Sequence, residues 1–190
     1  MRVQGAWLVW LLLGVGVLVP WRAAASALPA PVLAAIEQGE AVVLMRHALA
    51  PGTGDPPGID LSDCSTQRNL SESGRAQARD LGEALRALGL QRFTVWTSPW
   101  CRCRDTAEAL GYGTPQARTE LGSFFAGRGD ARIQTAALSR ALRRWDGGPL
   151  LLVTHQVNIT ALTGVVPRSG DWMVVERDLP HRVLFPAFSR

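Results

Sequence analysis

Four residues of this chain have side chains suited to phosphate chemistry, and each follows a short apolar segment. Arg46 and His47 come directly after the run AVVLM. Arg102 lies a few residues beyond FTVWT, and His155 follows LLLVT directly. Guanidinium groups bind phosphate oxygens in a bidentate manner, and an imidazole can act as a nucleophile. Together these residues predict a cationic site for a phosphate-like ligand.

The elements that would position these residues follow from the hydrophobic pattern. Continuous apolar runs of this length are typical of strands buried on both faces. The predicted strands are residues 41–45, 93–97 and 149–154, with late strands at 172–176 and 182–185 that could form an edge hairpin. Helices are predicted at residues 29–39, 72–88, 100–110 and 131–145, and from 156 to near 164, with a long loop at 51–65. This alternation predicts an α/β layered fold with a largely parallel sheet.

The position of the polar residues matters more than their types. Each of the three groups lies just beyond the carboxyl end of a predicted strand, where open α/β sheets bind ligands. Taken singly, Arg46-His47 could be a surface pair, His155 could cap the sheet edge, and Arg102 could be a charge on a helix face. Their shared position favours a common site.

Three segments resemble motifs of the histidine phosphatase superfamily, which has the phosphoglycerate-mutase-like fold. Residues 44–48 (LMRHA) resemble its Arg-His-Gly signature, and residues 98–107 (SPWCRCRDTA) are similar to its second block. Residues 153–155 (VTH) resemble its third block, and residues 67–78 resemble the helix start between the first two. The resemblance covers residues 40–165 or so. It implies a three-layer α/β/α fold with a mostly parallel central sheet.

The resemblance also implies a mechanism. His47 is expected to be the nucleophile and to become a transient phosphohistidine. Arg46, Arg102 and His155 are expected to bind the phosphate oxygens and to stabilise their charge during transfer. This chemistry needs no metal ion or other cofactor. The expected activity is therefore hydrolysis of a phosphomonoester.

The sequence departs from the superfamily pattern near the expected proton donor. Ala48 replaces the glycine after the nucleophile, and Gln156 stands where the acid-phosphatase branch has a proton-donating Asp. Glu120 is the nearest candidate for the acid of the mutase-like branch, although it could equally be a solvated loop charge. Asp105 and Asp130 are weaker candidates. Without an acid, the chain could instead be a degenerate member that binds a phosphorylated ligand or partner without turnover.

The three cysteines allow two interpretations. In an oxidising compartment, Cys64 could form a disulfide with Cys101 or Cys103 and leave one free thiol. Alternatively, Cys101 and Cys103 could belong to a metal clip. Arg104 is two residues from Arg102 on the expected helix, so it should point elsewhere, toward solvent.

The N-terminus has the features of an export signal. Arg2 precedes an apolar run at residues 6–19 and a small-residue stretch at 23–27. We expect residues 1–27 to be a signal peptide, with an uncleaved membrane anchor as the alternative. Residues 28–190 would then form a single domain that is secreted or periplasmic.

Charge and composition limit the partners. The net charge is +4, and two arginines with no acids lie in the expected signal, so about half of it is lost on cleavage. The sequence has no run of Lys or Arg with interleaved aromatic residues, so a nucleic-acid partner is not expected. We expect a small-molecule or envelope phosphomonoester as substrate. Membrane association is expected only through an uncleaved N-terminal segment.

Overall fold

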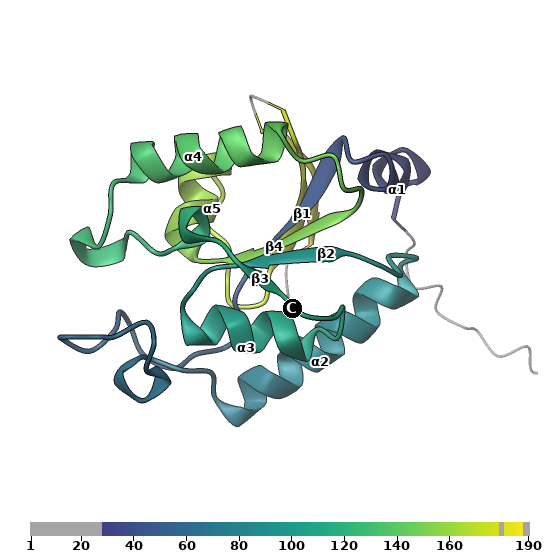
Figure 1. Cartoon of the computed structure of the whole chain (residues 1–190). Helices are drawn as coiled ribbons and strands as arrows, with labels where there is room; N and C mark the ends of the chain where they lie inside the picture. Colours follow the sequence, from purple (N-terminus) through teal and green to yellow (C-terminus); the bar gives the residue numbers. More distant parts are fainter. Residues whose placement is uncertain (1–27, 179–180, 188–190) are drawn as a thin grey trace, which may run out of the picture.

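The computed structural model describes residues 28–178 and 181–187, and it shows a central sheet with helices on both sides (Figure 1). The strands are β1 (Ala41–Arg46), β2 (Thr94–Thr97), β3 (Gln116–Ala117), β4 (Leu150–Thr154), β5 (Trp172–Glu176) and β6 (Val183–Ala187), in the spatial order β3-β2-β4-β1-β5-β6. The four strands from β3 to β1 are parallel, whereas β5 and β6 are antiparallel. The predicted α/β fold with a mostly parallel sheet is confirmed.

The helices divide between the two faces of the sheet. The α-helices are α1 (Ala30–Glu37), α2 (Glu72–Ala87), α3 (Cys101–Ala109), α4 (Ala131–Arg143) and α5 (Gln156–Thr163); the short 3-10 helices are η1 (Cys64–Thr66), η2 (Thr119–Leu121) and η3 (Phe125–Gly127). Apolar side chains of α1, α2 and α3 pack on one face. Those of α4 and α5 pack on the other, so the domain has three layers (Figure 1).

The strand β1 shows why the central strands are apolar throughout. Val42 and Leu44 pack toward α4 and α5, whereas Val43 and Met45 pack toward α2 and α3. Successive side chains of a strand point to opposite faces, so helices on both sides bury all four residues, each at most 1 % exposed. Burying an aliphatic side chain contributes roughly 1.5–3 kcal/mol. The buried strand therefore holds the residues that follow it in a fixed place.

The start of α2 packs against the segment that follows the predicted nucleophile. Ser71 caps the helix, because its hydroxyl accepts a hydrogen bond from the Gly74 amide at 3.0 Å. A Cβ on Gly74 would lie 2.0 Å from the carbonyl oxygen of Leu49, so only glycine fits here. On the other side, the Ala48 amide donates to the Thr106 hydroxyl of α3 at 3.0 Å. Two helices thus fix the chain just after His47.

Four short elements differ from the sequence expectations, and one predicted segment lies outside the described residues. The two-residue strand β3 and the short helices η2 and η3 were not expected, and η1 interrupts the end of the predicted loop. The predicted signal or anchor at residues 1–27 lies outside the described residues. Within residues 28–178 and 181–187, no helix is long and apolar enough to cross a membrane.

Candidate active site

A cavity of about 190 Å³ opens beyond the carboxyl ends of β1 and β4. It is lined by Arg46, His47, Gly52, Thr53, Gly54, Arg68, Arg102, Ser123, Phe125, His155, Gln156 and Val157. The structure therefore brings together four of the five predicted site residues, from segments more than 100 residues apart in the sequence. Glu120 is the exception.

His47 is buried in a neutral form that suits a nucleophile. Its side chain is 2 % exposed, and its Nδ1 lies 2.8 Å from the carbonyl oxygen of Ala48. A carbonyl only accepts hydrogen bonds, so Nδ1 carries the proton and Nε2 keeps its lone pair. Burial is the main cause that lowers the pKa of His47 to about 3, with neighbouring arginines adding to it. At neutral pH the imidazole is thus uncharged.

His155 is fixed by two partners at the N-terminus of α5. Its Nδ1 lies 3.3 Å from Nη2 of Arg102, and its Nε2 lies 2.7 Å from the hydroxyl of Ser98. Arginine can only donate, so Nδ1 accepts and Nε2–H donates to Ser98. Burial, followed by the nearby His47 and Arg102, lowers the pKa of His155 well below its ordinary value. The two imidazole rings lie 5.5 Å apart.

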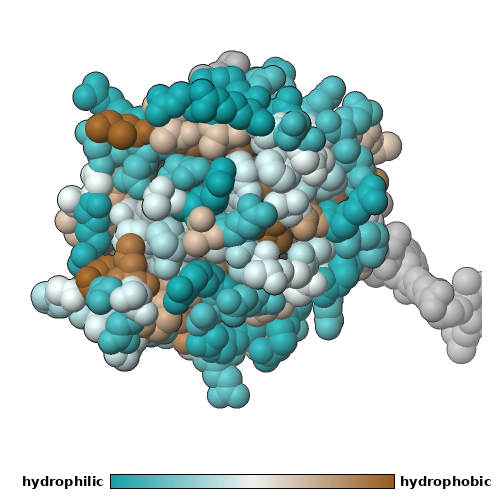
Figure 2. Space-filling model, in the orientation of Figure 1, coloured by the Kyte–Doolittle hydropathy of each residue, from teal (hydrophilic) through white to brown (hydrophobic). Residues whose placement is uncertain are grey.

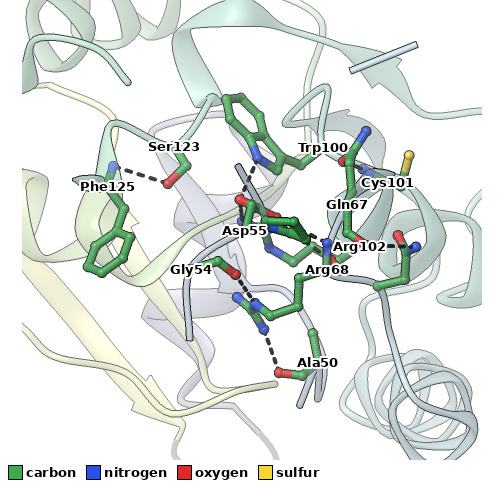
Figure 3. Close-up of polar contacts among 12 residues, drawn as sticks. Ala50, Gly54, Asp55, Gln67, Arg68, Trp100, Cys101, Arg102, Ser123 and Phe125 are labelled. Carbon is green, nitrogen blue, oxygen red and sulfur yellow. Dashed lines mark hydrogen bonds and ion pairs between the residues drawn. The ribbon is translucent and has the colours of Figure 1, made fainter. Parts of the chain in front are cut away.

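Arg102 forms a buried ion pair with Asp55, a residue that sequence reasoning missed. Its Nη1 and Nη2 donate to the two carboxylate oxygens at 2.7 and 3.2 Å, and both side chains are at most 4 % exposed. Trp100 Nε1 donates to the same carboxylate at 3.1 Å (Figure 3). Burial raises the pKa of Asp55, but hydrogen bonding and attraction from Arg102 outweigh it, so the pKa lies below its ordinary value. Asp55 both orients the guanidinium and occupies two of its donors.

Arg68 is a second cavity residue that was not predicted as a site residue. Its Nε donates to the Gly54 carbonyl at 2.7 Å, and its Nη1 donates to the carbonyl of Ala50 (Figure 3). Arg46 is held by a hydrogen bond that its Nη1 donates to the Pro167 carbonyl at 2.9 Å. The Nε atoms of Arg46 and Arg102 are buried and have no hydrogen-bond partner among residues 28–178 and 181–187. The cavity therefore has three guanidinium groups on its lining.

The structure does not bring the candidate acids into the cavity. Glu120 forms an ion pair with Arg118, whose Nε lies 3.2 Å from Oε1, and it lines a different hollow. Asp105 pairs with Arg75 at 2.7 Å, and Asp130 caps α4 by accepting from two backbone amides. Among the described residues, the cavity lining holds no carboxylate. Glu120 was predicted as the proton donor only from its position along the chain. In the structure its carboxylate pairs with Arg118 instead of facing the cavity.

The arrangement of the cysteines confirms the disulfide interpretation, and the metal-clip interpretation is wrong. Cys64 and Cys101 form a disulfide, and Cys103 is a buried free thiol. Burial raises the pKa of Cys103 to about 12, so this thiol stays protonated although it lies 3.6 Å from His155 Nε2. Arg104 is half-buried rather than exposed, because its Nη2 lies 3.0 Å from both disulfide sulfurs. It does point away from the cavity, as expected.

Fold and site together define an α/β protein with a cationic cavity at the carboxyl edge of its sheet. A sequence comparison identifies a particular family: residues 42–123 match the model of the histidine phosphatase superfamily (branch 1). No curated protein matches the chain. The match spans 82 of the 190 residues, so it shows a likeness to this superfamily over that segment.

Solved structures share the fold at low sequence identity. The protein histidine phosphatase SixA bound to tungstate is 18 % identical, with a TM-score of 0.56 over 78 % of this chain and 96 % of that one. The protein TTHB049 from Thermus thermophilus is 20 % identical, with a TM-score of 0.55 over 78 % and 99 %. A mycobacterial glucosyl-3-phosphoglycerate phosphatase is 20 % identical, with a TM-score of 0.54 over 79 % and 99 %. At this identity the likeness establishes the fold alone.

Proposed function

We propose that this chain is a phosphatase that transfers a phosphoryl group to His47 and then to water. The observation that carries the proposal is the buried, neutral imidazole of His47 in a cavity lined by three guanidinium groups. A neutral nitrogen nucleophile needs its lone pair, and the bond from Nδ1 to the Ala48 carbonyl leaves that lone pair on Nε2. Cationic donors offset the charge of a phosphate brought beside it.

In the proposed first step, Nε2 of His47 forms a bond to phosphorus while the bond from phosphorus to the leaving group breaks. The leaving group departs with the electron pair. In the second step, water attacks phosphorus, the nitrogen–phosphorus bond breaks, and inorganic phosphate leaves with the imidazole restored. Arg46, Arg102 and Arg68 stabilise the negative charge on the phosphoryl oxygens in both steps. No step requires a cofactor.

The finer parts of the proposal concern substrate and location. We propose a small-molecule or envelope phosphomonoester as substrate, and an exported protein whose residues 1–27 are a signal peptide. Two structural neighbours are named for different substrates, a phosphorylated protein histidine and glucosyl-3-phosphoglycerate. These differ in the atom that leaves phosphorus, so the leaving group is the property to test.

A second candidate function is the binding of a phosphorylated ligand without turnover. Two observations favour it: Gln156 lines the cavity in place of an acid, and Asp55 occupies two donors of Arg102. Such a protein would bind phosphate and release the ligand unchanged. Turnover that depends on His47 separates the two functions.

The test compares hydrolysis of p-nitrophenyl phosphate by the wild type with that by His47→Gln, which removes the nucleophilic nitrogen and keeps a polar side chain. We expect no detectable hydrolysis by this variant and unchanged circular dichroism. His181→Gln is the matched control, since His181 is also buried but bonds Ser139 on the α4 side of the sheet. A folded His47→Gln protein that retains most of the wild-type kcat would contradict the proposal.

A further inference from the structure

An aromatic side chain stands at the mouth of the cavity, and phosphate binding does not explain it. The ring of Phe125 lines the cavity and is 45 % exposed. In Figure 3 it lies on the other side of Gly54 from Arg68 and Arg102. Figure 2 shows an apolar area at the left of the molecule, over the loops that follow β1 and η2. The cavity thus has a cationic base and an aromatic edge.

The turn that carries Phe125 is strained. Ala126 has φ 56° and ψ 36°, and it is the only residue other than glycine with a positive φ among those the structure describes. Left-handed backbone is unfavourable for alanine, and such strain is found at sites where the surroundings impose it. Here the Phe125 amide donates to the hydroxyl of buried Ser123 at 3.3 Å. The turn therefore holds the ring at the cavity mouth at some cost to stability.

The opposite loop leaves space for the ring. A Cβ built on Gly54 would lie 3.5 Å from Cε1 of Phe125, so the ring lies beside this loop at a position where no side chain projects. Gly54 itself has φ 71°, a conformation that other residues rarely adopt. The ring is thus bounded by two loops, and its exposed part faces the opening. An exposed apolar ring at this position gains free energy when a ligand covers it.

The size of the cavity determines what reaches the ring. A volume of about 190 Å³ is smaller than the roughly 300–1,000 Å³ of pockets that enclose a whole drug-sized ligand. A phosphoryl group at the cationic base leaves too little of this space to enclose a whole larger substrate. The substituent on phosphorus must then leave through the mouth, against Phe125. This side chain consequently meets the leaving group and not the phosphate.

We propose that Phe125 determines specificity by selecting substrates in which phosphorus is attached to a planar ring, through oxygen or through nitrogen. This inference rests on the proposed phosphatase function and names its substrate class. A flat ring can stack on Phe125 or meet it edge to face, whereas a short alkyl chain or a polar sugar gains little there. An aryloxide or a protonated imidazole also leaves phosphorus more readily than an alkoxide does, which suits a cavity lining without a carboxylic acid.

The binding test uses phosphonates, whose carbon–phosphorus bond is not hydrolysed, as competitive inhibitors of the full chain. Phenylphosphonate, cyclohexylphosphonate and methylphosphonate separate a flat ring from a puckered ring and from no ring. In the wild type we expect phenylphosphonate to bind about tenfold more tightly than methylphosphonate, within the range of one aromatic contact. In Phe125→Ala this ratio should fall close to one. Phe125→Leu should keep a preference for cyclohexylphosphonate and lose that for phenylphosphonate.

The matched control is Ile133→Ala, which removes another exposed apolar side chain, 67 % exposed, from a different hollow. It should leave the ratio unchanged. An equal ratio in the wild type and Phe125→Ala, with hydrolysis that depends on His47 intact, overturns the inference and leaves the phosphatase proposal standing. A wild type that neither binds a phosphonate nor hydrolyses p-nitrophenyl phosphate overturns both.

A second arm separates the two kinds of ring substrate. The kcat/KM of the wild type is measured on phenyl phosphate, on N-phosphoimidazole and on methyl phosphate. Turnover of the first indicates a ring oxygen, and turnover of the second a ring nitrogen; either supports the inference when Phe125→Ala lowers that turnover more than it lowers the turnover of methyl phosphate. Methyl phosphate turned over faster than both ring substrates would contradict it.

Discussion

The guanidinium of Arg102 is held between the carboxylate of Asp55 and the imidazole of His155. These contacts fix its orientation before any ligand binds. They also mean that phosphate must compete with a carboxylate for the same donors. A planar guanidinium has five N–H donors and can contact the carboxylate and a ligand at once, whereas a lysine ammonium has the same charge but fewer donors.

Arg102→Lys should therefore lower kcat/KM, although the charge is retained. A hydrogen bond to a charged group contributes about 1.5–3 kcal/mol, so the loss of one such bond predicts a decrease of roughly 10- to 100-fold. The control is Arg104→Lys, two residues away, whose guanidinium contacts the disulfide and does not line the cavity. Steady-state kinetics on p-nitrophenyl phosphate measure both. Equal losses of kcat/KM in the two variants would show that the Arg102 guanidinium does not contact the substrate.

The buried histidines also affect stability. The folded-state pKa of His47 is about 3, and that of His155 lies well below its ordinary value, both mainly because of burial. An unfolded histidine binds a proton below pH 6.5 or so. Between this pH and the folded pKa, the unfolded state holds more protons, and the folded state loses stability as the pH falls.

We expect the free energy of unfolding to decrease by about 1.4 kcal/mol per pH unit for each of these histidines, from about pH 6 toward pH 4. In His47→Gln one of the two contributions is removed, so its stability should fall less steeply with acidification than that of the wild type. Urea unfolding at a series of pH values measures the two slopes, and comparing proteins cancels the carboxylates common to both. Parallel curves would mean that His47 is not buried in the neutral form.

Among the elements, the loop between β1 and α2 contributes most to the site beyond the strands. It provides Asp55 and Arg68 and is joined to the start of α3 by the Cys64–Cys101 disulfide. Gln67 adds a second link, because its side-chain oxygen accepts from the Cys101 amide at 3.0 Å. The covalent link thus lies next to Arg102 and holds the loop near it.

Cys64→Ser should lower the free energy of unfolding by about 2–4 kcal/mol, the usual contribution of a disulfide. A reductant should lower the stability of the wild type by a similar amount and leave that of the variant unchanged. Thiol titration of the denatured, unreduced wild type should find one free thiol, that of Cys103. Three titratable thiols, or a variant as stable as the oxidised wild type, would contradict this role of the disulfide.

Elements with a clear hydrophobic period were predictable, whereas short irregular ones were not. The runs that became β1, β2 and β4 are continuous and apolar, and Ser71 marks the start of α2. β3 has two residues, and η3 contains a left-handed alanine, so neither has a periodic pattern to detect. Phe125, which η3 brings to the cavity, was missed for that reason.

At the scale of the whole molecule, the sheet edge gathers residues that are far apart in the sequence. Rules of α/β topology place Arg46, His47, Arg102 and His155 at one edge, and the structure brings them into one cavity. The partners within that cavity could not be foreseen in the same way. Asp55 is 47 residues from Arg102 in an irregular loop, and only the folded chain shows that they pair.

The central claim, that His47 becomes a phosphohistidine, is tested most directly by trapping the labelled enzyme. Radiolabelled substrate is mixed with the protein and quenched in alkaline detergent within one turnover, and the labelled residue is identified by peptide mass spectrometry. We predict label on His47, stable to base and labile to acid, and none in His47→Gln. Rapid turnover by the wild type without label on His47, or with label on another residue, would contradict the account.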